Sequence, residues 1–140
     1  MEENMALRSI RKVGDPVLTK HSKEVRKMTP RLEELIDDML DTMYEAGGVG
    51  LAAPQVGISL RIFTYSYQDD EGAPWRGVVI NPELWMHPLE PGAPVPDDES
   101  EGCLSFPGER FALRRSETVR VTGTDLDGAR VELEVSGWRA

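Results

Sequence analysis

The chain has 140 residues, of which 39% are hydrophobic and 29% charged, a composition typical of one soluble globular domain over residues 1–140. Its 25 acidic and 16 basic residues give a net charge of -9, which disfavours nucleic acid and anionic membranes as partners. No apolar run approaches the length of a membrane span, and the N-terminus lacks the apolar block of a secretory signal. We therefore expect a cytoplasmic protein, in agreement with its single cysteine.

A long helix is predicted after an irregular lead-in over residues 8–21. Thr29 is a suitable N-cap, Pro30 suits the first helical position, and Gly47-Gly48 would end the helix. One face of this helix is apolar and should be core: Leu32, Leu35, Ile36, Met39, Leu40 and Met43. Three acidic residues fall mainly on the other side and should be solvated: Asp37, Asp38 and Asp41.

Strands are predicted for most of the chain after residue 60, because apolar residues there alternate or form short runs. The expected strands are 61–67, 77–81, 84–87, 110–113, 118–124 and 130–135. Asp127-Gly128 indicates a two-residue hairpin turn, and residues 88–100 read as a long acidic, proline-rich loop. In the lead-in, three apolar residues are expected to pack on the core: Val13, Val17 and Leu18.

The segment from Gly48 to Gly57 is rich in glycine and alanine, so its backbone can turn sharply or come close to a ligand. It is not a phosphate-binding loop, because no Lys and Ser or Thr follow its glycines and a helix precedes it. Taken alone, it is better explained as a helix end that runs into a tight connection.

Cys103 is the only cysteine and cannot form a disulfide within the chain. It is a candidate nucleophile, a candidate metal ligand or a small buried apolar residue. Glu101 and Ser105 give its surroundings a polar character at odds with plain core packing. A lone cysteine is more often a packing residue than a reactive one, so the residue alone favours packing.

Two segments of the sequence, taken together, indicate a protein family more specifically than Cys103 alone. Gly48-Val49-Gly50-Leu51-Ala52-Ala53-Pro54-Gln55 and Glu101-Gly102-Cys103-Leu104-Ser105 resemble the first and second signature motifs of bacterial peptide deformylases. Three further stretches resemble that family and stand in the same order: Gly14–Leu18, Ile80-Asn81-Pro82, and Phe106-Pro107 with Arg110. The resemblance as a whole covers residues 7–137. The resemblance implies an α+β fold with one long N-terminal helix and antiparallel or mixed sheets around a metal-site groove.

The resemblance also implies an activity, namely metal-dependent hydrolysis of the formyl group from the N-terminal formyl-methionine of nascent proteins. Cys103 would bind the divalent metal, iron(II) or zinc. The Gln55 side chain and the backbone N–H of Leu104 would donate hydrogen bonds to the negative charge that develops on the formyl oxygen. Gly50, which has no side chain, would let the formyl group come close. The implied substrate-binding residues are Val49, Glu101, Gly102 and Arg110. The implied partners are N-formylmethionyl peptides and nascent chains near the ribosome, without direct contact to nucleic acid or membrane.

The family's third motif, His-Glu-x-x-His on a C-terminal helix, has no counterpart among the 140 residues. The two histidines, His21 and His87, are too far apart to form it and are expected to be surface or strand residues. The chain therefore looks truncated, and we expect it to bind metal poorly or not at all, to be inactive, and to associate through the face that the helix would cover.

Two other functions stay open at this point. One is a catalytically dead module that keeps a peptide-binding groove over residues 49–55 and 102–110. The other is Cys103 as a nucleophile or redox switch, which would need a neighbouring base or positive charge.

Overall fold

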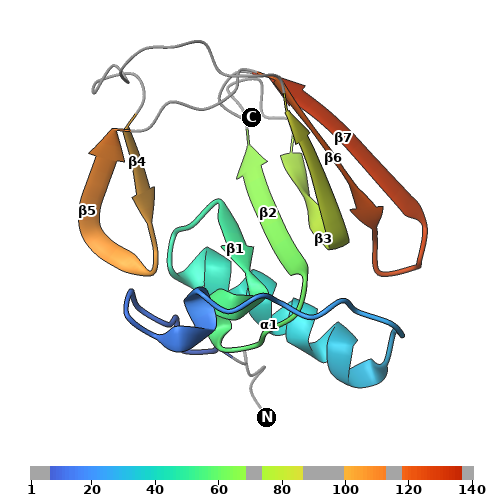
Figure 1. Cartoon of the computed structure of the whole chain (residues 1–140), viewed down its shortest axis with the longest axis horizontal. Helices are drawn as coiled ribbons and strands as arrows, with labels where there is room; N and C mark the ends of the chain where they lie inside the picture. The colour runs from blue at the N-terminus through green and yellow to red at the C-terminus, as the bar shows by residue number, and fades with distance from the viewer. Residues whose placement is uncertain (1–6, 69–73, 87–99, 113–117, 137–140) are drawn as a thin grey trace.

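The computed structural model describes residues 7–68, 74–86, 100–112 and 118–136. In these ranges one long helix, α1 (Pro30–Glu45), packs on a five-stranded antiparallel sheet of strand order β1-β2-β3-β6-β7, and a two-stranded ladder β4–β5 lies to one side (Figure 1). The strands are β1 (Gly50–Ala52), β2 (Ile62–Gln68), β3 (Pro74–Met86), β4 (Ser100–Cys103), β5 (Phe106–Ala112), β6 (Thr118–Thr124) and β7 (Arg130–Ser136). Two short 3-10 helices, η1 (Pro16–Leu18) and η2 (Ala53–Val56), complete the described elements. The predicted α+β class is confirmed, whereas the extent of the single domain stays a prediction.

Helix α1 begins and ends where its local chemistry requires. The Thr29 hydroxyl accepts a hydrogen bond from the Leu32 N–H at 3.2 Å, which satisfies one of the free donors of the first turn, and Pro30 follows at the first helical position. After Ala46 the chain enters a left-handed conformation at Gly47, with φ 72°, which a residue without Cβ adopts at little cost. Both predicted ends of the helix are therefore confirmed.

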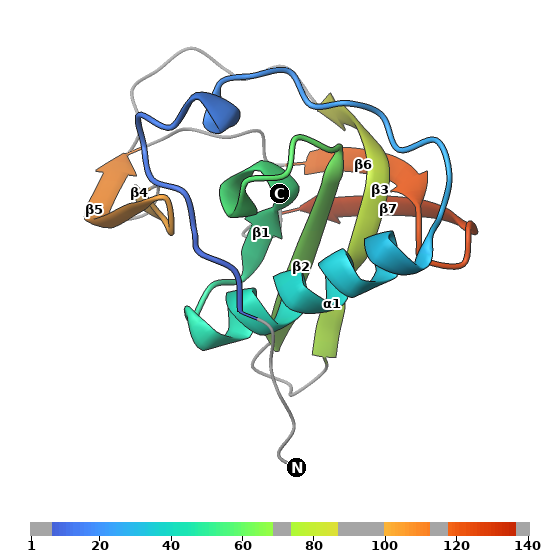
Figure 2. The same cartoon turned by 90° about the horizontal axis from the view of Figure 1, so that it is seen from below.

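The core lies between α1 and the first strands of the sheet. Figure 2 shows α1 crossing β2 and β3, and the apolar side chains between the helix and the sheet form one cluster. Its buried members are Leu32, Leu35, Ile36, Met39, Met43, Leu51, Ala53, Val56, Ile62, Val78 and Ile80. Each large member contributes roughly 1.5–3 kcal/mol by leaving water. The predicted apolar face of α1 is confirmed, with Leu40 partly buried at its edge.

One predicted surface residue of α1 is buried. Asp38 is only 6% exposed and its carboxylate accepts a hydrogen bond from Arg8 Nε at 3.0 Å, with Arg8 Nη2 at 2.9 Å. Thr42, one turn later, is also buried and accepts a hydrogen bond from the Arg8 N–H at 3.0 Å. The expectation that Asp38 is solvated is wrong, because the lead-in crosses this side of the helix.

Strand β3 is continuous where the sequence predicts two strands. Asn81 has a φ of 54°, and the pairing with β6 shifts register between Ile80 and Glu83. The bulge allows Pro82, which has no N–H, to stay within the strand without breaking it. The Asn81 side chain also clamps the lead-in, since its Oδ1 accepts from the Val25 N–H and its Nδ2 donates to the Val25 carbonyl, both at 2.7 Å.

Strands β6 and β7 form the predicted hairpin, but its loop is longer than two residues. The connection runs over residues 125–129, and the Asp125 carboxylate accepts hydrogen bonds from the N–H groups of Asp127 at 2.9 Å and Ala129 at 3.0 Å. Gly128 has a φ of 81° within this loop. An aspartate that holds the backbone two residues ahead is an Asx turn, and this competing local structure lengthens the loop.

The lead-in contacts the rest of the structure through backbone hydrogen bonds more than through buried side chains. Val13 is 60% exposed, so the expectation that it packs on the core is wrong, and Val17 and Leu18 are half-buried. His21 is exposed, as expected, and His87 lies outside the described residues. In the described part of the chain, no helix has the length and apolar character needed to cross a membrane.

The packing of α1 generates a stability prediction. Ile36→Ala should lower the free energy of unfolding by about 2–5 kcal/mol, because Ile36 is 0% exposed and its truncation leaves a cavity. Asp37→Ala, at the exposed neighbouring position, is the matched control and should change it by no more than about 0.5 kcal/mol. Urea denaturation measures both, and equal effects would contradict this account of the core.

Candidate functional site

Gln55 is held at a fixed place by the two buried residues beside it in η2. Ala53 is 0% and Val56 6% exposed, so η2 is anchored in the core directly after β1. The Gln55 carbonyl oxygen Oε1 accepts a hydrogen bond from the Ala52 N–H at 3.0 Å. Because the oxygen end of the amide is turned toward its own chain, the nitrogen end faces outward from η2.

The amide nitrogen of Gln55 reaches the second signature segment. Its Nε2 donates to Ser105 Oγ at 3.1 Å and lies 3.8 Å from Cys103 Sγ. Ser105 is only 4% exposed, whereas Cys103 is an exposed free thiol. The structure thus brings together two residues that are 48 positions apart in the chain, as the resemblance implies. Their roles toward a substrate stay predictions.

Leu104 ties this segment to the core. It lies between β4 and β5, is partly buried and packs against the main apolar cluster. Its side chain passes so close to Gly48 that a Cβ added there would lie 2.7 Å from Leu104 Cδ1. The glycine at position 48 therefore makes room for Leu104, and both signature segments meet at this contact.

Gly50 begins strand β1, just before η2, and Val49 precedes it. Gly50 is exposed and pairs with Tyr65 across β1 and β2, and a Cβ added to it would meet only the Thr64 carbonyl oxygen at an ordinary 3.7 Å. The fold does not need a glycine at position 50, which leaves close approach of a ligand as a reason for it. Val49 is 56% exposed, as a residue that contacts substrate would be.

Three predicted substrate-binding residues lie on the β4–β5 ladder. Gly102 pairs with Arg110, and Glu101 pairs with Phe111 in the adjacent position. Glu101 and Arg110 are thus one register step apart, at positions that alternate between the two faces of the ladder, and the placement of their side chains lies outside the described residues. The roles of these three residues toward a substrate stay predictions.

The lead-in joins the two signature segments through its backbone, a contact that sequence analysis missed. The Arg11 backbone N–H donates a hydrogen bond to the backbone carbonyl oxygen of Gln55 at 2.6 Å. The Val13 backbone N–H donates one to the backbone carbonyl oxygen of Ser105 at 2.9 Å. Arg11 also forms an ion pair with Asp15 at 3.0 Å. The Val17 backbone N–H and, next, Arg11 hold the pKa of the Asp15 carboxyl below its ordinary value. Backbone hydrogen bonds leave no pattern in the residue types, so no sequence signal pointed to this contact.

The described residues do not by themselves make up a metal centre. The Cys103 sulfur is exposed and chemically suited to bind zinc or iron, but a catalytic site normally needs three protein ligands. Nowhere in the described ranges do three His, Cys, Asp or Glu side chains come together in a way that could hold a metal ion. Within the described ranges, Cys103 is therefore a candidate ligand without the two further ligands of a complete site.

Comparison with known proteins shows the class to which this fold and site belong. The family model for polypeptide deformylase matches residues 7–140. A peptide deformylase of Rhodococcus opacus is 52% identical over 134 residues, which cover 93% of this chain and 68% of the relative. The peptide deformylase of Mycobacterium marinum is 49% identical over 140 residues and is covered to 71%.

Solved structures agree with the sequence relatives. A peptide deformylase from Legionella pneumophila superposes with a TM-score of 0.81 at 38% identity, covering 96% of this chain and 75% of that one. A peptide deformylase from Synechococcus elongatus in complex with actinonin superposes with a TM-score of 0.80 at 34% identity. The match covers 100% of this chain and 71% of that one. The chain belongs to the polypeptide deformylase family, whose members are hydrolases.

The two glycines give a matched pair of predictions. Gly48→Ala should shift the Leu104 methyl group and lower the free energy of unfolding by about 1 kcal/mol, the lower end of the overpacking range, because the obstructing atom is the end of a flexible side chain. Gly50→Ala should leave it within about 0.5 kcal/mol, because the added methyl meets only an ordinary contact. Urea denaturation, with the NMR methyl signals of Leu104 as a local probe, measures both. A destabilised Gly50→Ala protein would show that the fold itself requires this glycine.

Proposed function

We propose that this chain carries the formyl-binding half of a peptide deformylase site, which acts on the N-terminal formyl-methionine of nascent proteins in the cytoplasm, near the ribosome. The observation that carries the proposal is the approach of Gln55 Nε2 to Cys103 Sγ at 3.8 Å, within a chain that belongs to this family. The expected substrates are N-formylmethionyl peptides. Val49, Glu101, Gly102 and Arg110 would contact the peptide beyond the formyl group.

The chemistry of the formyl group explains why an amide side chain belongs here. Attack on the formyl carbon places negative charge on its oxygen, and donors fixed in advance stabilise that charge. We assign this role to Gln55 Nε2 and to the Leu104 backbone N–H, with Gly50 allowing the group to come close. Nε2 has two acceptors within hydrogen-bonding distance, Ser105 Oγ at 3.1 Å and Cys103 Sγ at 3.8 Å. The longer contact, to sulfur, is the weaker one and the one that would be exchanged for the formyl oxygen.

A divalent metal, iron(II) or zinc, would supply this reaction with a nucleophile by lowering the pKa of a bound water. Cys103 is the ligand that the described residues offer, and the family's His-Glu-x-x-His motif does not occur in the 140 residues. We therefore propose that the 140-residue chain binds metal weakly or not at all and does not hydrolyse formyl-peptides by itself. Adding the missing ligands and the glutamate should restore turnover.

A catalytically dead peptide-binding module is the second candidate function. It is supported by the hydrogen bonds among Ala52, Gln55 and Ser105, which fix the position of the Gln55 amide through protein groups. The two functions predict different affinities of the 140-residue chain for a formyl-methionyl peptide. A peptide-binding module should bind the peptide tightly, whereas an incomplete deformylase should bind it weakly. Actinonin, found in complex with the Synechococcus elongatus relative, is a second ligand for the same comparison.

The activity prediction uses two proteins, the 140-residue chain and the same chain followed by the C-terminal segment of the Rhodococcus opacus relative that lies beyond the aligned part. With iron(II) or zinc supplied and formyl-Met-Ala-Ser as substrate, formate release should be absent from the first and catalytic in the second. Gln55→Ala in the extended protein should lose about a hundredfold or more in kcat, because one donor to the developing oxyanion is gone.

Asp37→Ala in the extended protein is the matched control, because Asp37 is exposed on α1 and should leave kcat unchanged. Metal content, measured by mass spectrometry of the purified proteins, should rise only in the extended form. Turnover by the 140-residue chain would refute the proposed inactivity. An extended protein that binds metal but tolerates Gln55→Ala would refute the role of Gln55.

A further inference from the structure

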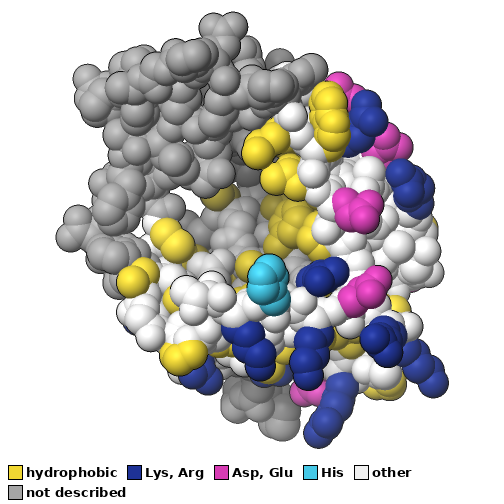
Figure 3. All heavy atoms as spheres, in the orientation of Figure 1, with side chains coloured by type: hydrophobic (Ala, Val, Ile, Leu, Met, Phe, Trp, Pro, Cys, Tyr) yellow, Lys and Arg dark blue, Asp and Glu magenta, His cyan; other side chains and the backbone are white. Residues whose placement is uncertain are grey.

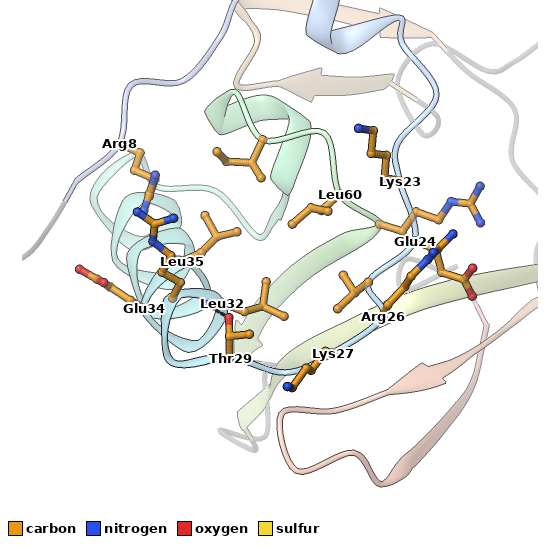
Figure 4. A pocket seen from close by; sticks show the side chains of 14 residues that line it. Arg8, Lys23, Glu24, Arg26, Lys27, Thr29, Leu32, Glu34, Leu35 and Leu60 are labelled. Atoms are coloured by element: carbon orange, nitrogen blue, oxygen red, sulfur yellow. Dashed lines mark hydrogen bonds between the residues drawn. The ribbon is translucent and has the colours of Figure 1, made fainter.

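A basic groove lies beside the first turns of α1, and neither Gln55 nor Cys103 lines it. We use this name for a cavity of about 1220 Å³ lined by Arg8, Lys23, Glu24, Val25, Arg26, Lys27, Thr29, Arg31, Leu32, Glu34, Leu35, Ile58, Leu60 and Arg61. None of these residues takes part in the candidate functional site. Figure 4 shows the groove between the segment that carries Lys23 to Lys27 and the start of α1, with Leu32, Leu35 and Leu60 turned toward its floor.

The groove has a charge opposite to that of the chain as a whole. Its lining contains six of the 16 basic residues but two of the 25 acidic ones, so it carries a net charge of +4. The remaining residues carry -13, since the whole chain is at -9. In Figure 3 the Lys and Arg side chains gather along the lower edge of the molecule, where Figure 1 shows α1 and the lead-in.

Most of these cations lack an anionic partner within the described residues. Arg8 is neutralised by Asp38, at 2.9 Å, whereas Lys23, Arg26, Lys27, Arg31 and Arg61 form no ion pair there. Lys23, Arg26 and Lys27 are exposed. Positive charges gathered at one place repel one another, and an anionic ligand would relieve that repulsion.

The wall that carries three of the cations is held rigidly. Lys23 donates its N–H to the Ser59 carbonyl and accepts from the Arg61 N–H, both at 2.9 Å. Two positions later, Asn81 clamps both backbone groups of Val25 at 2.7 Å. The opposite wall is α1 itself. A groove with two fixed walls loses little conformational freedom when it binds a ligand.

The size and lining of the groove indicate the class of ligand. Its volume exceeds the roughly 300–1,000 Å³ typical of small-molecule sites, which favours a stretch of polymer. Grooves for single-stranded nucleic acid usually carry aromatic side chains for base stacking, and no aromatic residue is among the described residues that line this groove. Its floor is aliphatic instead, formed by Val25, Leu32, Leu35, Ile58 and Leu60.

We propose that the basic groove binds an acidic peptide segment of another protein, with an aliphatic side chain on the floor and Asp or Glu side chains against the cationic walls. This binding is separate from deformylation and does not depend on the proposed function. Clusters of basic side chains recognise acidic motifs in this way in other proteins.

The test uses the full 140-residue chain and fluorescein-labelled dodecapeptides that alternate Glu or Asp with Leu. Fluorescence anisotropy should show binding that weakens as salt is raised, because opposite charges meet at the walls. Replacing the acidic residues by Gln, or the Leu residues by Ser, should each abolish most of the binding.

Charge-reversal variants locate the site. Arg26→Glu should weaken binding of the acidic peptide by about fivefold or more, because one attractive contact is replaced by a repulsive one. Arg130→Glu is the matched control, since it changes the net charge equally at an exposed position on β7, and it should have little effect. Thermal unfolding of both variants checks that the fold is retained.

Four results would overturn the proposal. The first is absence of binding of the acidic Leu-containing peptide, and the second is equal weakening by the two charge reversals. The third is an oligouridylate that binds tightly at Arg26 while the peptide does not, which would make this a nucleic-acid site. The fourth is self-association of the chain that depends on Arg26 in the absence of peptide binding, shown by sedimentation.

Discussion

The candidate site depends on the side-chain amide of Gln55, which connects two segments that are far apart in the chain. Its oxygen is held by the Ala52 N–H at 3.0 Å, and its nitrogen therefore points at Ser105 and Cys103. The buried Ser105 hydroxyl gains from the same contact, because a buried polar group without a partner costs about 1–3 kcal/mol. The lead-in adds backbone hydrogen bonds to both segments, so the geometry around the sulfur is determined by several independent contacts.

Local sequence signals were sufficient to predict the ends and the buried face of helix α1. Thr29, Pro30 and Gly47 mark the ends of α1 because capping depends on neighbours in the chain, and the apolar period identifies its buried face. Tertiary contacts decided the rest. Asp38 is buried because a distant arginine reaches it, and β3 is continuous because a bulge at Asn81 accommodates Pro82. The three-residue β1 and four-residue β4 have too little alternation to be recognised, and they were missed.

The site itself was predictable only through the paired signature segments, because a single cysteine and a glycine-rich stretch each have an ordinary structural explanation. The resemblance implied that Gln55 and Cys103 converge, and the structure places them 3.8 Å apart. What could not be predicted are contacts made by backbone groups, such as those of Arg11 and Val13. The basic groove was also hidden, since its cations are scattered from residue 8 to residue 61 and the net charge of -9 conceals them.

The position of the Gln55 amide in solution is the most direct test of the central claim. In the 140-residue chain labelled with nitrogen-15 and carbon-13, NOESY spectra should show contacts from the Gln55 side-chain amide hydrogens to the Hβ protons of both Ser105 and Cys103. These contacts should accompany the cross-strand contacts of β2 and β3, which report the folded sheet. A folded sheet without any contact between Gln55 and either residue would contradict the account.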